Sequence, residues 1–259
     1  MSRTRAGVSA IALLLTIVLG TAVSTVPTPL YPVYVSALGL DAVGVTATFA
    51  VFAAGAVLGL VSAASASRLI TRRRAFVVSG ALQIVAALVL GLDLGLGGFV
   101  VGRILSGIGA GVLAASGTAF VRELVGRAPD ACLTRFVAAF APAAAYLGLG
   151  AGPALGGLSG ATTLSAVHAL FLTLAVTVAA VLAVAVRALP ADLGTAQPGP
   201  QTRSGLPVSA GLGAFVAFMT TGLFGSVITV LLDRLGLTPS PAVAGVVVAA
   251  VFLAGAIGV

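Results

Sequence analysis

The sequence predicts an all-helical integral membrane protein, and three observations support that prediction. Hydrophobic residues make up 59% of the 259 residues and charged residues only 7%, against roughly 25% charged residues in an ordinary soluble domain. The apolar residues gather in eight runs, each close to the ~20 residues that a membrane helix needs. The 13 basic residues, all arginines, lie almost entirely between these runs. This composition suits a lipid environment and could not cover a soluble surface with polar groups.

The eight runs define the predicted organisation. They cover residues 8–35, 43–66, 75–92, 98–121, 136–158, 164–186, 208–231 and 242–259. Residues 188–207 hold four prolines and three glycines without apolar periodicity, which indicates a flexible loop. We therefore expect a six-helix bundle over 1–187, a cytoplasmic linker over 188–207, and an incomplete second bundle over 208–259 that contains helices 7 and 8.

The positions of the arginines predict the orientation, because cytoplasmic loops collect positive residues. With the N-terminus inside, eleven arginines fall on the cytoplasmic side and only Arg234 on the outer side, while Arg103 lies within a span. The first run has an alternative interpretation as a secretory signal peptide, since Arg3 and Arg5 precede it. Its continuation to Tyr34 and the alternation of loop charge favour a retained helix.

The chain also contains an internal repeat. Residues 50–56 read AVFAAGA and residues 250–256 read AVFLAGA, identical at six of seven positions. Leu-Gly-Leu occurs at 38–40 and again at 235–237, before each of these segments. Two matches in the same order indicate a duplicated six-helix unit. Such a duplication predicts about twelve helices in parallel repeats, so the chain is expected to end two-thirds of the way through its fold.

Arg103 is the most informative single residue. A guanidinium inside a span costs about 2.5–3.5 kcal/mol on insertion scales, so it should face the bundle interior or a water-filled cavity. Arg103, Gly107 and Gly111 follow at intervals of four and share one helix face, and the glycines allow another backbone to come close. The alternative is an arginine near the outer helix end that snorkels to the headgroups.

A second glycine motif lies in the fifth run. Gly148, Gly152 and Gly156 form a smooth stripe, and Pro153 and Gly157 complete the sequence GLGAGPALGG. Pro153 removes one backbone donor and bends the helix. A helix of this kind is expected to pack closely and to pivot, whereas the simpler interpretation is a general small-residue packing face.

These stretches resemble the major facilitator superfamily. Residues 148–157 match its fifth-helix pattern Gly-x-x-x-Gly-Pro-x-x-Gly-Gly, which is characteristic of the drug:proton antiporter branches. Residues 103–111 are similar to its fourth-helix pattern, and the prolines of 27–32 to the first helices of bacterial efflux members. The resemblance implies a bundle of the major facilitator type in a bacterial inner membrane, with the N-terminus in the cytoplasm, and a role for Arg103 in proton coupling.

The loop between the second and third runs departs from the family pattern Gly-x-x-x-Asp-Arg-x-Gly-Arg-Arg. Ser67 stands in place of the aspartate, and Ile70 or Thr71 in place of the glycine. In the family this carboxylate makes a contact that stabilises the two halves in the outward-facing state, so the resemblance implies a weaker contact here. The loop keeps the basic residues Arg68, Arg72, Arg73 and Arg74. These arginines serve either that contact or the topology alone.

Other kinds of chemistry find little support in the composition. One cysteine, one histidine and six acidic residues leave no metal site, no cofactor site and no intramembrane catalytic set to predict. A net charge of +7 would suggest nucleic acid in a soluble protein, but here the arginines lie between membrane runs, so no nucleic-acid partner is expected. His168, in the sixth run, has no evident partner in the sequence and is predicted to be a packed or cavity-lining residue, with a proton relay as the alternative.

The leading function is a secondary transporter, a monomer in the bilayer that exports a small molecule by proton-coupled alternating access. No Asp or Glu lies well inside a span, so a cationic substrate would need a carboxylate beyond this chain. Otherwise the substrate is neutral or anionic and Arg103 is the charged candidate. The alternative is a non-transporting membrane module or a truncated remnant of such a transporter.

Overall fold

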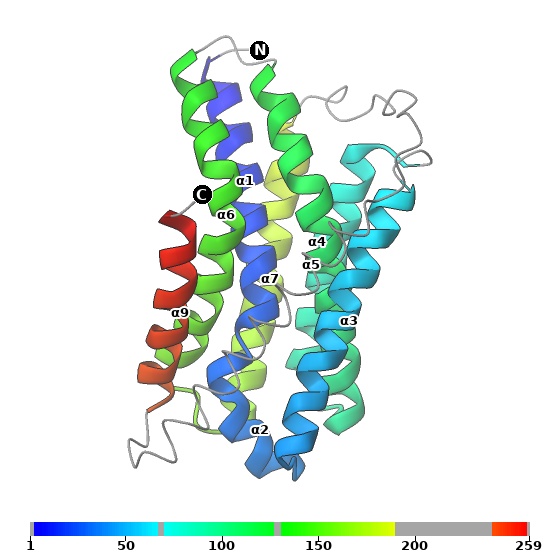
Figure 1. Cartoon of the computed structure of the whole chain (residues 1–259), viewed down its shortest axis with the longest axis vertical. Helices are drawn as coiled ribbons and strands as arrows, with labels where there is room; N and C mark the ends of the chain where they lie inside the picture. The colour runs from blue at the N-terminus through cyan, green and yellow to red at the C-terminus, as the bar shows by residue number, and fades with distance from the viewer. Residues whose placement is uncertain (1–2, 67–69, 127–130, 190–239, 258–259) are drawn as a thin grey trace.

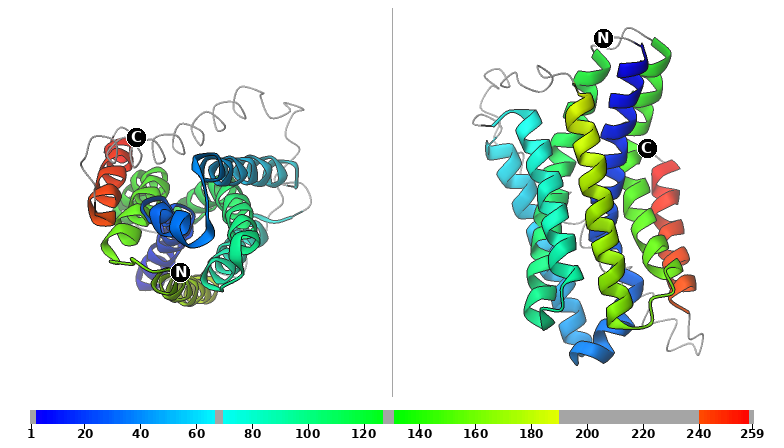
Figure 2. Two further views of the ribbon diagram at one scale, coloured as in Figure 1. Left: turned by 90° about the horizontal axis from the view of Figure 1, so that it is seen from below. Right: turned by 180° about the vertical axis from the view of Figure 1, so that it is seen from behind.

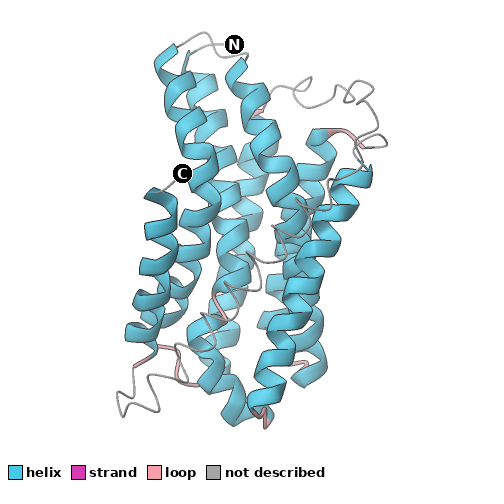
Figure 3. Ribbon diagram, viewed as in Figure 1, coloured by secondary structure: helices cyan, strands magenta, loops and turns pink. Residues whose placement is uncertain are grey.

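The computed structural model of the chain describes residues 3–66, 70–126, 131–189 and 240–257. This part of the chain is a bundle of long helices and contains no strand (Figures 1 and 3). The elements are α1 (Arg3–Thr25), the short 3-10 helix η1 (Thr28–Leu30), α2 (Tyr31–Leu38), α3 (Ala42–Ala66), α4 (Arg72–Gly91), α5 (Gly95–Gly126), α6 (Ala131–Leu158), α7 (Leu164–Ala188) and α9 (Pro241–Ile257).

The prediction of an all-helical membrane bundle is confirmed. Five described segments are long and apolar enough to cross a membrane: Gly7–Leu38, Val43–Ala66, Arg72–Gly91, Gly95–Gly117 and Leu164–Ala188. Helices α6 and α9 coincide with the predicted fifth and eighth spans. The predicted seventh span, 208–231, and nearly all of the predicted linker lie outside the described residues. The division of the chain at 187 and 207 therefore stays a prediction.

The first predicted span is not one helix, which corrects the sequence interpretation. Helix α1 ends at Thr25, η1 follows, and α2 begins at Tyr31. Pro27 has no N–H and cannot continue the hydrogen-bond ladder of α1. The amide of Val26 still donates to Ala22 O at 3.0 Å, and the amide of Leu30 then closes a turn onto Pro27 O at 3.0 Å. The break turns α2 so that Tyr31 and Tyr34 are buried in the bundle.

One end of the bundle collects the arginine-bearing segments. Ser9 Oγ of α1 donates to Ala188 O of α7 at 2.9 Å. Arg73 of α4 donates to Val186 O at 2.9 Å. These contacts place the start of α1, the start of α4 and the end of α7 together, as the antiparallel order in Figure 1 also shows. Helices α1, α4, α5 and α6 extend beyond their predicted spans at this end, because the predicted spans counted only apolar residues.

Helix α1 forms the centre of the packing. It contacts α4, α5, α6 and α7, and the end-on view shows these helices running side by side (Figure 2). The outward faces remain apolar, as Val43 and Val176 illustrate with exposures of 73% and 69%. On the outer face of α7, the Thr173 hydroxyl donates to Ala169 O at 2.8 Å and the Thr177 hydroxyl to Thr173 O at 2.8 Å. The hydroxyls are thus satisfied within the helix, as a lipid-facing surface requires.

Candidate functional site

Arg103 lies inside the bundle. It belongs to α5, its exposure is 1%, and it is the largest of the fully buried side chains. The snorkelling alternative does not describe this position, since the side chain is enclosed by other helices rather than extended to a surface. A buried cation needs compensating contacts, and three helices provide them.

The end of α1 supplies the hydrogen-bond acceptor. Arg103 Nη1 donates to Ser24 O at 2.6 Å, and Ser24 is the next-to-last residue of α1. The last carbonyls of a helix have no partner within it, and they form the negative end of the helix dipole. The break at Pro27 therefore creates the acceptor that holds the guanidinium.

Two phenylalanine rings of α3 supply further contacts, and the Tyr31 side chain of α2 forms a hydrogen bond with Arg103. The guanidinium carbon of Arg103 lies 4.4 Å from the ring centroid of Phe52 and 5.6 Å from that of Phe49. Cation–π contacts are worth about 2 kcal/mol when desolvated. Within the described chain no acidic side chain pairs with Arg103, and its Nε has no hydrogen-bond partner. The guanidinium keeps its charge and part of its donor capacity.

Gln83 of α4 extends the polar centre across the bundle. Its side-chain Nε2 donates to Ser106 O at 3.1 Å and to Ser24 Oγ at 3.3 Å. The Ser24 hydroxyl in turn donates to Ser106 O at 3.2 Å. Gln83 is fully buried, and its Oε1 accepts no hydrogen bond in the described structure. Three helices thus share one buried polar cluster next to Arg103.

An aromatic wall separates this cluster from the end of the bundle opposite the arginines. The Tyr34 and Phe99 rings stack with centroids 4.1 Å apart, and Tyr31 lies 4.8 Å from Phe49. The Tyr31 hydroxyl and Thr48 Oγ1 are 3.1 Å apart and share a hydrogen bond. The wall contains the same Phe49 that lies under Arg103. The sequence does not predict the places of Gln83, Ser24 or the tyrosines, because uncharged polar residues in apolar runs carry no distinctive signal.

The glycines of the fourth-span motif bring α5 against α3. A Cβ at Gly107 would meet Phe52 O, and one at Gly111 would meet Ala56 O. From the other side, a Cβ at Gly55 would meet Ile104 O at 2.7 Å. The two backbones are therefore in direct contact. The structure places Arg103, Gly107 and Gly111 on the face of α5 that contacts α3.

The glycines of the fifth-span motif lie on two faces of α6, which contact different helices. Cβ atoms at Gly148 and Gly152 would meet the carbonyl oxygens of Val18 and Ala22 on α1, and one at Gly156 would meet that of Val26, just after α1. Gly157 instead faces Pro241 of α9, and Gly245 of α9 faces Pro153 O. The motif therefore joins α1 on one side and α9, from the predicted second bundle, on the other.

Pro153 also explains a hydrogen bond between helices. A proline at this position leaves Leu149 O without its usual donor four residues on. Thr25 Oγ1 of α1 lies 3.1 Å from Leu149 O and 3.3 Å from Ala22 O, and it donates to these carbonyls. The side chain of one helix thus satisfies a carbonyl that the proline of another has freed.

The arginines of the loop between the second and third spans attach α4 to its neighbours. Arg68 and Ser67 lie outside the described residues. Arg72 forms an ion pair with Glu123 of α5 at 3.3 Å, and Arg73 donates to α7 as described above. The backbone amide of Arg74 donates to Thr71 Oγ1 at 3.3 Å, so Thr71 caps α4. These contacts join α4 to α5 and α7.

No protein-family model matches the sequence, and no curated protein matches it. Solved structures do. A POT family transporter in complex with 5-aminolevulinic acid is 17% identical, with a TM-score of 0.56 over 91% of this chain. One in complex with a thioalcohol conjugated peptide is 18% identical, with a TM-score of 0.56 over 91% of this chain. A mutant of peptide transporter POT in complex with alafosfalin is 20% identical, with a TM-score of 0.57 over 89% of this chain.

The fold is of the major facilitator type. The chain spans 47–49% of the length of these three structures, so it represents a partial bundle of that type. At such identities the similarity concerns the fold alone. It agrees with the helix order and with the multi-pass membrane character of the described helices.

Proposed function

We propose that this protein is a secondary transporter that exports a small molecule by alternating access, with protons as the coupling ion and Arg103 in the transport path. The observation that carries the proposal is a buried, incompletely bonded guanidinium at the centre of a bundle of the major facilitator type. Intramembrane charged residues are costly and usually mark substrate or ion pathways. The export direction and the proton coupling follow from the resemblance of the fifth-helix pattern to drug:proton antiporters.

The charge of the site favours a neutral or anionic substrate. Arg103 is the basic residue buried in the described spans, and the described acidic residues Asp41, Asp93 and Glu123 lie at or near helix ends. A cationic molecule would be repelled by the guanidinium, whereas an anionic group could use its free donor capacity. We therefore expect an organic anion or a neutral, rather apolar molecule.

The test uses the full-length protein in proteoliposomes with a panel of drugs, sugars and organic acids, with and without a proton gradient. Arg103→Ala is expected to abolish flux of the transported compound while insertion into the membrane remains. Arg103→Lys keeps a charge but loses the planar fork, and we expect it to retain roughly a tenth of the flux or less. Flux that is unchanged in Arg103→Ala would overturn the role of this residue.

The same assay separates the transporter from the alternative of a non-transporting module. Transport requires a second set of helices around the site. An open reading frame that continues past codon 259 with four further spans would support the transporter. A frame that stops there, together with a lack of flux for every compound of the panel, would favour the module.

A further inference from the structure

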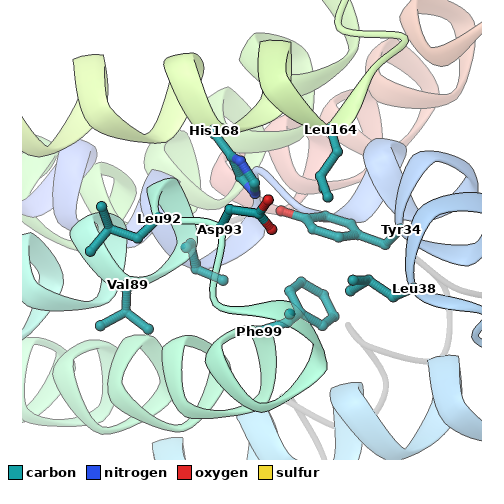
Figure 4. Close-up of a pocket in the computed structure, with 10 residues that line it drawn as sticks. Tyr34, Leu38, Val89, Leu92, Asp93, Phe99, Leu164 and His168 are labelled. Atoms are coloured by element: carbon teal, nitrogen blue, oxygen red, sulfur yellow. The ribbon is translucent and has the colours of Figure 1, made fainter.

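A small cavity lies at the end of the bundle opposite the arginines. Its volume is about 10 Å³, near the smallest size that accommodates one water. Residues from α2, α4, α5, α7 and the α4–α5 connection line it, and three of them carry titratable groups: Tyr34, Asp93 and His168. Figure 4 shows the hydroxyl, the carboxylate and the imidazole pointing toward one another. The other lining residues, such as Phe99 and Leu164, are apolar or glycine.

The Tyr34 hydroxyl points to a ligand in this cavity. Tyr34 is 2% exposed, and its hydroxyl has no hydrogen-bond partner in the described chain. A buried tyrosine hydroxyl normally finds a partner, because leaving it unpaired costs about 1–3 kcal/mol. The hydroxyl is therefore positioned to bind a polar group that is not part of the protein.

His168 is suited to hold a proton there. It is the one histidine of the chain, and imidazole is the side chain whose ordinary charge change falls between pH 5 and 8. The groups that face it are Asp93 from the α4–α5 connection and Tyr34 from α2, whereas the lining residues of α4 and α5 are apolar or glycine. Asp93 is exposed and His168 is half-buried, so water can reach both side chains.

We propose that Asp93 and His168 form a proton-binding site at this end, with the Tyr34 hydroxyl as its inner wall. On loading, a ring nitrogen of His168 takes a proton from solution, and the imidazolium faces the Asp93 carboxylate. The N–H bond forms as an O–H bond of hydronium breaks, and on release the N–H bond breaks as the proton returns to water. This deepens the proposed function and rests on it for its role in transport. Arginine cannot release its proton in a protein. Proton-coupled transport therefore requires a group other than Arg103 that binds and releases the proton.

The position of Tyr34 connects the two sites. Its ring stacks on Phe99 at 4.1 Å and meets Tyr31 at 6.4 Å. Tyr31 packs on Phe49, which lies 5.6 Å from the Arg103 guanidinium. One layer of aromatic rings therefore separates the proposed proton site from the buried cation.

The single histidine makes a direct test possible. In the full-length protein, labelled at histidine and held in lipid nanodiscs, imidazole NMR signals are followed from pH 4 to 9. We expect the signal that disappears in His168→Gln to titrate. The pH dependence of that signal should differ between Asp93→Asn and the unmodified protein, because Asp93 and His168 line the same cavity. Asp41→Asn is the matched control, since Asp41 is an exposed acidic residue outside the cavity lining, and it should leave the midpoint unchanged.

Two results would overturn the proposal: a His168 signal that does not titrate in this range, or one whose midpoint is the same in Asp93→Asn and Asp41→Asn. The proteoliposome assay keeps this outcome distinct from that of the proposed function. Titration that depends on Asp93, without any flux in the unmodified protein, would support the proton site and refute the transporter. Proton-driven flux that survives His168→Gln would refute the site and leave the transporter standing.

Discussion

At the scale of single residues, Arg103 depends on the Ser24 carbonyl at the C-terminal end of α1. Insertion of an arginine at the centre of a span costs about 2.5–3.5 kcal/mol. The contacts with Ser24 O and with the Phe52 ring offset that cost, and no acidic partner is needed. A site built in this way keeps a net positive charge, which is what a binding function for anions requires.

The hydrogen bond from Thr25 to Leu149 O leads to a prediction about stability. Thr25→Val removes the hydroxyl and leaves the carbonyl that Pro153 has freed without a donor. We expect the free energy of unfolding to fall by about 0.5–1.5 kcal/mol, the range found for single interhelical hydrogen bonds. Unfolding in mixed micelles with increasing denaturing detergent measures the change. Thr25→Ser, which retains the hydroxyl, should restore most of the loss.

A double-mutant cycle identifies the cause of that loss. Pro153→Ala supplies an N–H four residues after Leu149, so the carbonyl gains a partner within α6. In this background Thr25→Val should cost less than in the unmodified protein. Equal costs in both backgrounds would contradict the link between the proline and the threonine.

The sequence pointed to Arg103 but not to its partners, for a physical reason. A charge within an apolar run is conspicuous because it is expensive. Ser24 lies 79 positions and Gln83 20 positions away along the chain, and which helix faces meet depends on packing. The shared cavity of Asp93 and His168 could not be predicted for the same reason, since a loop aspartate and a span histidine give no joint signal.

At the scale of helices, the most extensive contact described is between α3 and α5. Gly107 and Gly111 leave room for the backbone of α3, and Gly55 and Gly59 leave room for that of α5. With lipid on the outside there is little hydrophobic drive to join helices, so close van der Waals packing of small residues has to stabilise the pair. This contact also sets the distance between Arg103 and the two phenylalanines of α3.

A methyl group at Gly111 should therefore be destabilising. In Gly111→Ala the new Cβ would meet Ala56 O and, at 2.7 Å, Leu60 N, both of them backbone atoms that cannot move alone. We expect a loss of about 1–3 kcal/mol in the free energy of unfolding, typical of overpacking. Gly97→Ala, also in α5, is the control, because nothing lies within 4 Å of its Cβ position. Equal stability of the two variants would contradict the close contact.

The sequence predicted these helices well, apart from the first. Hydropathy locates spans because every membrane crossing needs a long apolar run. It did not locate the break between α1 and α2, since the residues around Pro27 and Pro29 remain apolar and the run continues to Tyr34. The prolines of 27–32 match a family pattern. That pattern does not predict that the helix breaks at Thr25 and that a new one begins at Tyr31.

At the scale of the whole molecule, α9 packs on α6 through Gly157 and Gly245. Helices α3 and α9 lie on opposite sides of the bundle (Figure 1). The small-residue contact between α6 and α9 joins the predicted first unit to the predicted second one. A contact of this kind suits the rocking of two units against each other that we propose, because Gly157 and Gly245 allow the two backbones to come close.

The orientation in the membrane can be tested with two exposed positions. Asp41 lies just before the first residue of α3. Arg74 lies in the first turn of α4, which follows the other end of α3. With the N-terminus in the cytoplasm, as the arginine distribution predicts, Asp41 faces the outside and Arg74 the inside. Cysteines are introduced singly at these positions in a background where the native Cys132 is replaced by serine. Intact cells are then treated with a membrane-impermeant maleimide.

We expect Asp41→Cys to be labelled in intact cells and Arg74→Cys only after the membrane is made permeable. The reverse pattern would show that the N-terminus lies outside and would place the Asp93–His168 site on the cytoplasmic side. Labelling of both positions from one side would contradict a membrane crossing by α3. The direction in which a proton gradient could load His168 depends on this result, because Asp41 and Asp93 both lie at the end opposite the arginines. The orientation therefore decides which compartment supplies the proton in the proposed mechanism.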